Sequence, residues 1–168
     1  MHQLVMLRHA KATWPEGIAD EHRPLADRGQ DDASVAADLF RTELPRPDLV
    51  LISPALRVRQ TWDIAGAELD PAPPVRPEPA IYGASIDDVI DLLHALPEDI
   101  GTVLVAGHEP TMSRTTLALA GPSSSGPALA MVQRKFPTCG VAVLSIGGTW
   151  ADLAPGTAAL ESLAVPRA

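Results

Sequence analysis

Two cations and an imidazole follow the first apolar segment of the chain. The stretch LVMLRHAKATW, residues 4–14, begins as an apolar run and continues into Arg8, His9 and Lys11. A guanidinium group presents a planar fork of donors that matches phosphate oxygens, and a neutral imidazole can act as a nucleophile. These residue types indicate a site for a negatively charged ligand, with a solvated charged turn as the alternative.

Polar residues also follow two later apolar segments. Ser53 follows Asp48–Ile52, with Arg57 one helical turn further on, and His108 follows Thr102–Gly107. Side chains on a helix lean toward its N-terminus, so the Arg57 guanidinium can reach back over the strand end. The carboxyl ends of parallel strands lie at one edge of a sheet, which is where ligands bind in open α/β folds. We therefore expect these segments to bring two arginines and two histidines together.

The elements that must position these residues alternate along the chain. Apolar runs predict strands at Gln3–Leu7, Asp48–Ile52 and Thr102–Gly107. Amphipathic patterns predict helices that begin at Asp27 and after Ser53, and two more at Ser85–Leu96 and Thr111–Ala120. This alternation predicts a single α/β domain over residues 1–168, with three α/β/α layers and a mainly parallel sheet.

Local signals predict where three of the helices begin. Asp27 with Gln30 three residues later resembles a capping box. Ser53 and Pro54 suit the N-cap and the first helical position, and Ser85 suits the N-cap of the following helix.

Three further segments are predicted from their Gly and Pro content. Residues 70–79, DPAPPVRPEP, form a rigid connector, and residues 121–127, GPSSSGP, form a flexible loop. Val141–Ile146 and Thr149–Leu153 form a hairpin that turns at Gly147-Gly148.

Composition limits the classes of protein to consider. Of the 168 residues 46% are hydrophobic and 20% charged, which is typical of a globular domain rather than a disordered chain. The net charge of −8 argues against a nucleic-acid partner but allows one small cationic pocket. A single cysteine, Cys139, excludes an internal disulfide and is expected to be a buried, inert thiol. No leader or membrane-spanning run is evident, so we expect a cytoplasmic protein without a membrane partner.

Three short sequence blocks resemble those of a known family. LRH at 7–9, SPALRVRQT at 53–61 and GHEP at 107–110 resemble the blocks of the histidine phosphatase superfamily, phosphoglycerate-mutase-like branch. Within that branch LRHAKA at 7–12, together with RPL at 23–25, is most similar to the SixA-type phosphohistidine phosphatases. The resemblance implies a phosphoglycerate-mutase-like fold and a phosphatase activity.

The resemblance also implies a role for each matching residue. His9 would be the nucleophile and would become transiently phosphorylated, while Arg8, Arg57 and His108 would hold the phosphoryl group. Arginines that stabilise the charge of the phosphoryl group can replace a metal, so no metal or cofactor is expected.

The remaining candidate residues depend on weaker signals. The family usually places a catalytic carboxylate between the second and third blocks, where Glu78 is the best candidate, with Glu109 as the alternative. Lys11 and Arg23 are expected to line the rim and contribute to substrate binding, with plain solvated loop positions as the alternative.

The sequence thus predicts a metal-independent phosphatase acting on a phosphorylated protein, with phosphohistidine as the preferred group. Pro15 stands where the mutases of the family have Asn, and the chain has little room for a lid over small sugar phosphates. Two alternatives stay open: a small-molecule phosphomonoesterase acting on a sugar or nucleotide phosphate, and a non-catalytic phosphate-binding module. The oligomeric state is also open, with a monomer favoured.

Overall fold

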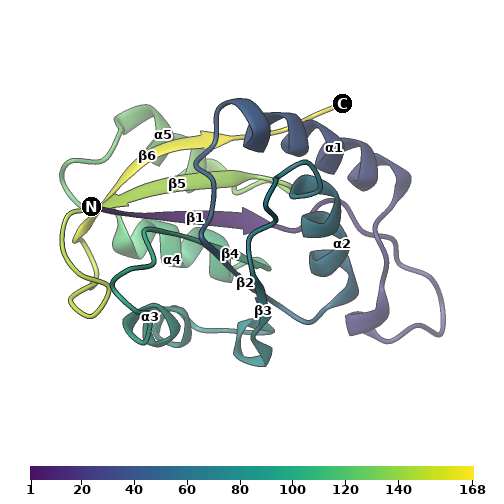
Figure 1. The fold of residues 1–168 in the computed structure, drawn as a ribbon. Coiled ribbons are helices and arrows are strands. Elements are labelled where there is room, and N and C mark those ends of the chain that lie inside the picture. The colour runs from purple at the N-terminus through teal and green to yellow at the C-terminus, as the bar shows by residue number, and fades with distance from the viewer.

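One six-stranded sheet forms the centre of the molecule (Figure 1). The computed structural model describes residues 1–168. The strand order is β3-β2-β4-β1-β5-β6. The strands are β1 (His2–Arg8), β2 (Leu49–Ile52), β3 (Val75–Pro77), β4 (Thr102–Gly107), β5 (Val141–Ile146) and β6 (Ala158–Ala164). The first four strands pair in parallel, and β5 and β6 continue the sheet antiparallel to their neighbours.

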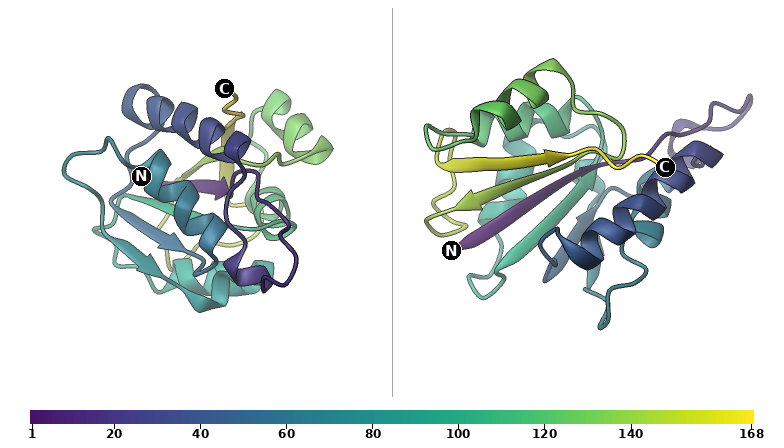
Figure 2. Two further views of the ribbon diagram at one scale, coloured as in Figure 1. Left: turned by 90° about the vertical axis from the view of Figure 1, so that its right-hand side faces the viewer. Right: turned by 90° about the horizontal axis from the view of Figure 1, so that it is seen from above.

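Helices cover both faces of this sheet, which confirms the predicted three layers. One face is covered by α1 (Asp27–Thr42) and α2 (Leu56–Ala65), and the other by α3 (Ile86–His94), α4 (Thr111–Leu119) and α5 (Gly126–Arg134). The view from above in Figure 2 shows the strands between these two groups of helices. Two short 3-10 helices, η1 (Asp20–His22) and η2 (Pro79–Ile81), lie in the connections.

Strand β1 divides the core between the two faces. Leu4 and Met6 pack into the cluster under α3, α4 and α5, whereas Val5 and Leu7 pack into the cluster under α1 and α2. All four side chains are fully buried, as expected for a central strand of a doubly covered sheet.

The parallel register brings three strand ends to one edge. Arg8 at the end of β1 lies opposite Gly107 at the end of β4, and Ile52 at the end of β2 lies opposite Ala106. The residues that follow these strands therefore enter the same region of space, as the sequence predicted.

The helix starts follow the sequence signals only in part. The Ser85 cap is confirmed: its hydroxyl accepts from the Asp88 N–H at 3.1 Å, and the Asp88 carboxylate accepts from the Ser85 N–H at 2.9 Å. The prediction of a capping box at Asp27 is wrong. Asp27 is already helical, and the N-cap is Ala26, which has no side-chain cap. The Ala26 N–H donates instead to the Lys11 carbonyl at 2.9 Å, which ties the start of α1 to the chain that follows β1.

The predicted N-cap at Ser53 is also wrong. Helix α2 begins at Leu56 with Ala55 as its N-cap, so Pro54 precedes the helix. The Ser53 hydroxyl lies 2.8 Å from His108 Nε2 and is used in the site described below.

The C-terminal hairpin has a different second strand from the one predicted. Strand β5 has the predicted bounds, but its partner is β6, and residues 147–157 form the connection. Trp150 is fully buried in that connection, and its indole N–H donates to the Ile100 carbonyl at 2.7 Å. Trp150 and Leu153 are both buried in the core, but they belong to an irregular segment. Their apolar character therefore does not reflect the alternation of a strand, which the sequence had suggested.

Strand β3 and helix α5 are further elements that the sequence did not predict. Strand β3 pairs with β2 inside the predicted connector, as an exposed edge strand where a proline is tolerated. Helix α5 begins at Gly126, inside the predicted loop at residues 121–127, with the Ser125 hydroxyl as its cap.

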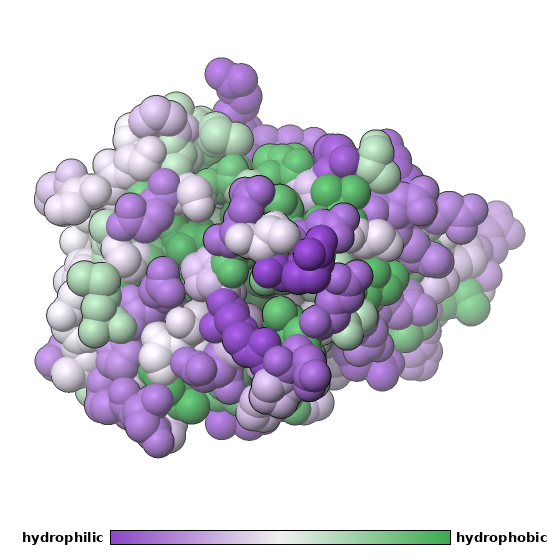
Figure 3. All heavy atoms as spheres, turned by 45° about the horizontal axis from the view of Figure 1, so that its top comes forward, coloured by the Kyte–Doolittle hydropathy of each residue, from purple (hydrophilic) through white to green (hydrophobic).

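The outer surface is of mixed polarity. No helix combines the length and the apolar character needed to cross a lipid bilayer. On the face that Figure 3 shows, hydrophobic side chains are interspersed with hydrophilic ones.

Gly29 in α1 supports a testable prediction about the packing beneath the site. A Cβ atom at Gly29 would overlap the carbonyl oxygen of Lys11, so α1 can approach this segment only without a side chain there. Gly29→Ala should lower the free energy of unfolding by about 2 kcal/mol, although alanine is the better helix former. Urea unfolding measures the change.

Gly126→Ala is the matched control, because the Cβ position at this helical glycine is open. This variant should be as stable as the wild type or slightly more stable. Equal stabilities for both variants would contradict the close approach of α1 to Lys11.

Candidate active site

A cavity of about 270 Å³ opens at the edge where the parallel strands end. Six of the seven sequence-predicted site residues line it, namely Arg8, His9, Lys11, Arg23, Arg57 and His108. The other lining residues are Ala12, Trp14, Asp20, Glu109 and Thr138. The predicted convergence of two arginines and two histidines from three strand ends is therefore present in the structure.

His9 is held in one tautomer by the backbone. Its Nδ1 lies 2.7 Å from the Ala10 carbonyl oxygen. A carbonyl oxygen only accepts hydrogen bonds, so Nδ1 carries the proton and Nε2 carries the lone pair. No protein group is hydrogen-bonded to Nε2. The backbone N–H of His9 donates to the Gly107 carbonyl at 3.1 Å, which extends the β1–β4 pairing to this residue.

The surroundings of His9 keep its imidazole neutral. The pKa of His9 is lowered from 6.5 to about 3, mainly by burial and also by the nearby His108, Arg57 and Arg8, against the opposing effect of the Ala10 carbonyl. A neutral imidazole with a free Nε2 lone pair is the form that can attack phosphorus.

His108 is held between a serine and an arginine. Its Nδ1 lies 3.2 Å from Arg57 Nη2, and guanidinium groups only donate, so Nδ1 accepts and the Nε2 proton points to the Ser53 hydroxyl. Burial and the charge of Arg57 lower the pKa of His108 to about 4. Its ring centroid lies 5.5 Å from that of His9.

Asp20 organises the arginines on one side of the cavity, and sequence reasoning missed it. Arg57 donates from Nη1 to the Asp20 backbone carbonyl at 2.7 Å and from Nη2 to the carboxylate at 3.0 Å. Arg23 Nε lies 3.2 Å from the same carboxylate, and the Arg23 guanidinium lies 3.4 Å from the ring centroid of Trp14. Hydrogen bonds from Tyr82 and Arg57 lower the pKa of Asp20.

The turn at residues 136–140, which precedes β5, forms hydrogen bonds with Arg8 and His9. Arg8 donates from Nη1 to the Phe136 carbonyl at 2.9 Å and from its backbone N–H to the Gly140 carbonyl at 3.1 Å. The Cys139 N–H donates to the His9 carbonyl at 3.0 Å. Cys139 has a left-handed φ of 60°, which points to a constrained turn at this position. Cys139 is fully buried, as predicted, and burial raises the pKa of its thiol to about 12.

Helix α2 braces the chain that follows His9. The Thr61 hydroxyl accepts from the Ala10 N–H at 2.9 Å and donates to the Arg57 carbonyl at 2.7 Å. The Gln60 side-chain oxygen accepts from the Leu25 N–H at 2.9 Å. The side chains of SPALRVRQT thus position the backbone of the neighbouring loop as well as supplying Arg57.

The structure does not bring Glu78 into the cavity. Its backbone N–H donates to the Ile52 carbonyl at 2.8 Å, and its carboxylate forms an ion pair with Arg76 at 2.8 Å. Glu109, the alternative from the sequence, does line the cavity, and its carboxylate accepts from the Ser113 N–H at 2.7 Å.

Residues 4–95 match the sequence model of the histidine phosphatase superfamily (branch 1). The chain belongs to this superfamily. An uncharacterized protein of Mycobacterium tuberculosis is 44% identical over 162 residues, which is 96% of this chain and 100% of the relative.

Two solved structures are similar to this phosphatase in both sequence and fold. A protein of Nakamurella multipartitia assigned as phosphohistidine phosphatase SixA is 36% identical, with a TM-score of 0.87 and coverage of 99% of this chain and 97% of that one. A protein of Agrobacterium tumefaciens with the same assignment is 31% identical, with a TM-score of 0.83 and coverage of 98% of each chain. The expected phosphoglycerate-mutase-like fold is confirmed.

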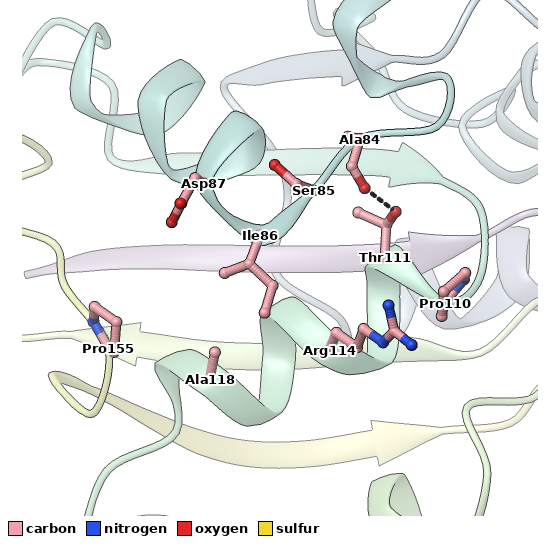
Figure 4. A pocket seen from close by; sticks show the side chains of 9 residues that line it. All are labelled: Ala84, Ser85, Ile86, Asp87, Pro110, Thr111, Arg114, Ala118 and Pro155. Atoms are coloured by element: carbon pink, nitrogen blue, oxygen red, sulfur yellow. Dashed lines mark hydrogen bonds between the residues drawn. The ribbon is translucent and has the colours of Figure 1, made fainter.

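A larger cavity of about 440 Å³ lies between α3 and α4 of the phosphatase (Figure 4). Its lining contains one cation, Arg114, and no histidine. The groups suited to phosphoryl transfer therefore meet only in the smaller cavity. No three His, Cys, Asp or Glu side chains are grouped so that they could hold a metal ion.

The two site histidines predict how stability depends on pH. Below pH 6.5 the unfolded chain protonates both histidines, whereas the folded phosphatase protonates His108 only near pH 4 and His9 near pH 3. The free energy of unfolding should therefore fall as the pH decreases from 7 to 5, with a limiting slope of about 1.4 kcal/mol per pH unit for each histidine. Urea unfolding at several pH values measures this slope.

His108→Asn should remove the contribution of one histidine and flatten the slope. His22→Asn is the control, because His22 is exposed outside the cavity, and it should keep the wild-type slope. A wild-type stability that stays constant from pH 7 to 5 would contradict the neutral, buried state of both rings.

Proposed function

We propose that this phosphatase hydrolyses phosphohistidine on proteins, through an enzyme intermediate in which His9 carries the phosphoryl group. The observation that supports the proposal most directly is the state of His9. Its proton is bound at Nδ1 by the Ala10 carbonyl, its Nε2 is free, and it lies among cationic side chains in the cavity.

The charge of the cavity favours a phosphoryl dianion. Two carboxylates, Asp20 and Glu109, are outnumbered by four cations, Arg8, Lys11, Arg23 and Arg57. Both histidines are neutral, so the lining carries a net positive charge within a chain whose total is −8. Preorganised donors of this kind stabilise the oxygens of a phosphoryl group in transfer.

In the first step the lone pair of His9 Nε2 forms a bond to phosphorus while the bond to the leaving group breaks. For a phosphohistidine substrate the leaving imidazole keeps the electron pair of the broken bond, and its other ring nitrogen carries a proton. In the second step water attacks the phosphorus, and His9 leaves with its Nδ1 proton still bound by the Ala10 carbonyl. Inorganic phosphate is released with the protons of the water.

The carboxylates of the site favour phosphohistidine over an ester. An alkoxide leaving group needs a proton donor, whereas an imidazole leaves as a neutral ring. Glu78 is paired with Arg76 outside the cavity, and Asp20 accepts from Tyr82 and Arg57. Glu109 does line the cavity, but its carboxylate accepts from the Ser113 N–H. The two neighbours assigned as SixA phosphohistidine phosphatases, at 36% and 31% identity, support the same substrate class.

The nucleophile is tested by trapping the intermediate. His9→Ala should lower turnover of a phosphohistidine peptide by at least about 1,000-fold, because no other lone pair replaces that of Nε2. Rapid quench of the wild type with ³²P-labelled substrate should yield acid-labile label on His9. His22→Ala should keep wild-type turnover and labelling.

Either of two outcomes would contradict the mechanism. Turnover by His9→Ala near the wild-type rate would exclude His9 as the nucleophile. Tight phosphate binding without any labelled enzyme would instead support the non-catalytic binding module.

The substrate class is tested by comparing a phosphohistidine peptide with a phosphoserine peptide. The wild type should have the higher kcat/KM on phosphohistidine, and Glu78→Gln should change neither value by more than about twofold, because this carboxylate lies outside the cavity. A higher kcat/KM on the ester, or a large loss with Glu78→Gln, would favour the phosphomonoesterase.

A further inference from the structure

Large hydrophobic side chains are exposed beside the active site. The structure has six exposed side chains of this kind: Met1, Trp14, Ile18, Val75, Tyr82 and Met131. Three of them, Trp14, Ile18 and Tyr82, belong to segments that border the cavity. We call these three residues the mouth surface.

Two residues of the mouth surface, Trp14 and Tyr82, are tied directly to the cavity or its lining, and the third, Ile18, belongs to the loop beside it. Trp14 and Asp20 both line the cavity, and Ile18 lies between them on the same loop. Tyr82 donates from its hydroxyl to the Asp20 carboxylate, and its ring packs edge-on against His108 with 5.3 Å between centroids. In Figure 1 this loop, which follows β1, projects beyond the rest of the molecule on the right.

Packing within the chain does not account for this exposure. Trp14 is 77% exposed and Ile18 46% exposed, whereas large side chains such as Trp150 and Phe136 are buried in the core. Arg23 lies over one face of the Trp14 ring and helps to orient it. Tryptophan and tyrosine are among the residue types that contribute most to the binding energy of protein interfaces.

We propose that the mouth surface is the docking site for a folded protein that presents the phosphohistidine among apolar side chains. This inference rests on the proposed function and adds the kind of partner. Ile18 does not line the cavity, so a small substrate held there has no contact with it, whereas a protein surface around the phosphohistidine would cover it.

The charges near the mouth surface define the partner further. The same loop carries two exposed acidic residues outside the cavity lining, Glu16 and Glu21, whereas its exposed cation, Lys11, lines the cavity. Where the partner surface faces Glu16 and Glu21 it should therefore be neutral or basic, because acidic residues would be repelled there.

The test compares a large and a small substrate of the same chemistry. The probes are a small folded protein with one surface phosphohistidine among apolar residues, and the free phosphohistidine amino acid. Ile18→Ser should lower kcat/KM on the protein about tenfold, mainly through KM, and change kcat/KM on the amino acid by less than twofold. Ile18→Leu, which keeps the apolar side chain, should retain the wild-type values.

Met131→Ser is the matched control, because Met131 is 43% exposed on α5, outside the cavity lining. It should change neither value. Equal losses on both substrates with Ile18→Ser, or no loss on the protein, would overturn the docking proposal. A wild-type dimer that Ile18→Ser converts to a monomer in sedimentation would also overturn it, because a second copy would then cover the surface.

Failure of the proposed function would be distinguishable from these results. In that case the wild type would hydrolyse neither phosphohistidine probe. If the wild type hydrolyses both and Ile18→Ser is unaffected, only the docking site is overturned.

Discussion

The hydrogen bond between His9 Nδ1 and the Ala10 carbonyl is the interaction on which the chemistry of the site depends. It decides which ring nitrogen carries the lone pair, and burial then keeps that nitrogen unprotonated. The bond holds only if the backbone around His9 is rigid. That rigidity comes from two sides, because Gly107 of β4 accepts from the His9 N–H and Cys139 donates to the His9 carbonyl.

The cations of the site are positioned by backbone carbonyls and by a single carboxylate, Asp20, which Arg57 and Arg23 share. Arg8 is oriented by the backbone carbonyl of Phe136, and Arg57 by the backbone carbonyl as well as the carboxylate of Asp20. A carbonyl oxygen orients a guanidinium without neutralising it, and one carboxylate cannot neutralise two arginines, so a positive field stays available to an anion. Burial is the main cause of the low pKa of both histidines, and the positive field acts in the same direction, so the cations that orient the phosphoryl group also help to keep the nucleophile neutral.

Several features of the fold were predictable from local patterns. The continuous apolar runs of β1, β2 and β4 and the Ser85 cap of α3 depend on neighbouring residues, and they were predicted correctly. The caps at Asp27 and Ser53 failed because tertiary contacts replaced the local signal. Ser53 uses its hydroxyl for His108, and the chain before Asp27 is tied to Lys11.

The sequence by itself determined that Arg8, His9, Arg57 and His108 follow strand ends, and parallel pairing then requires them to meet at one edge. Only the tertiary structure decided what surrounds them. Asp20 reaches Arg57 from a loop without periodicity, and Glu78 is drawn to Arg76 beside β3. Strand and helix positions follow from short-range patterns of burial, whereas the partner of a charged side chain in a loop depends on contacts between distant segments, which no local pattern encodes.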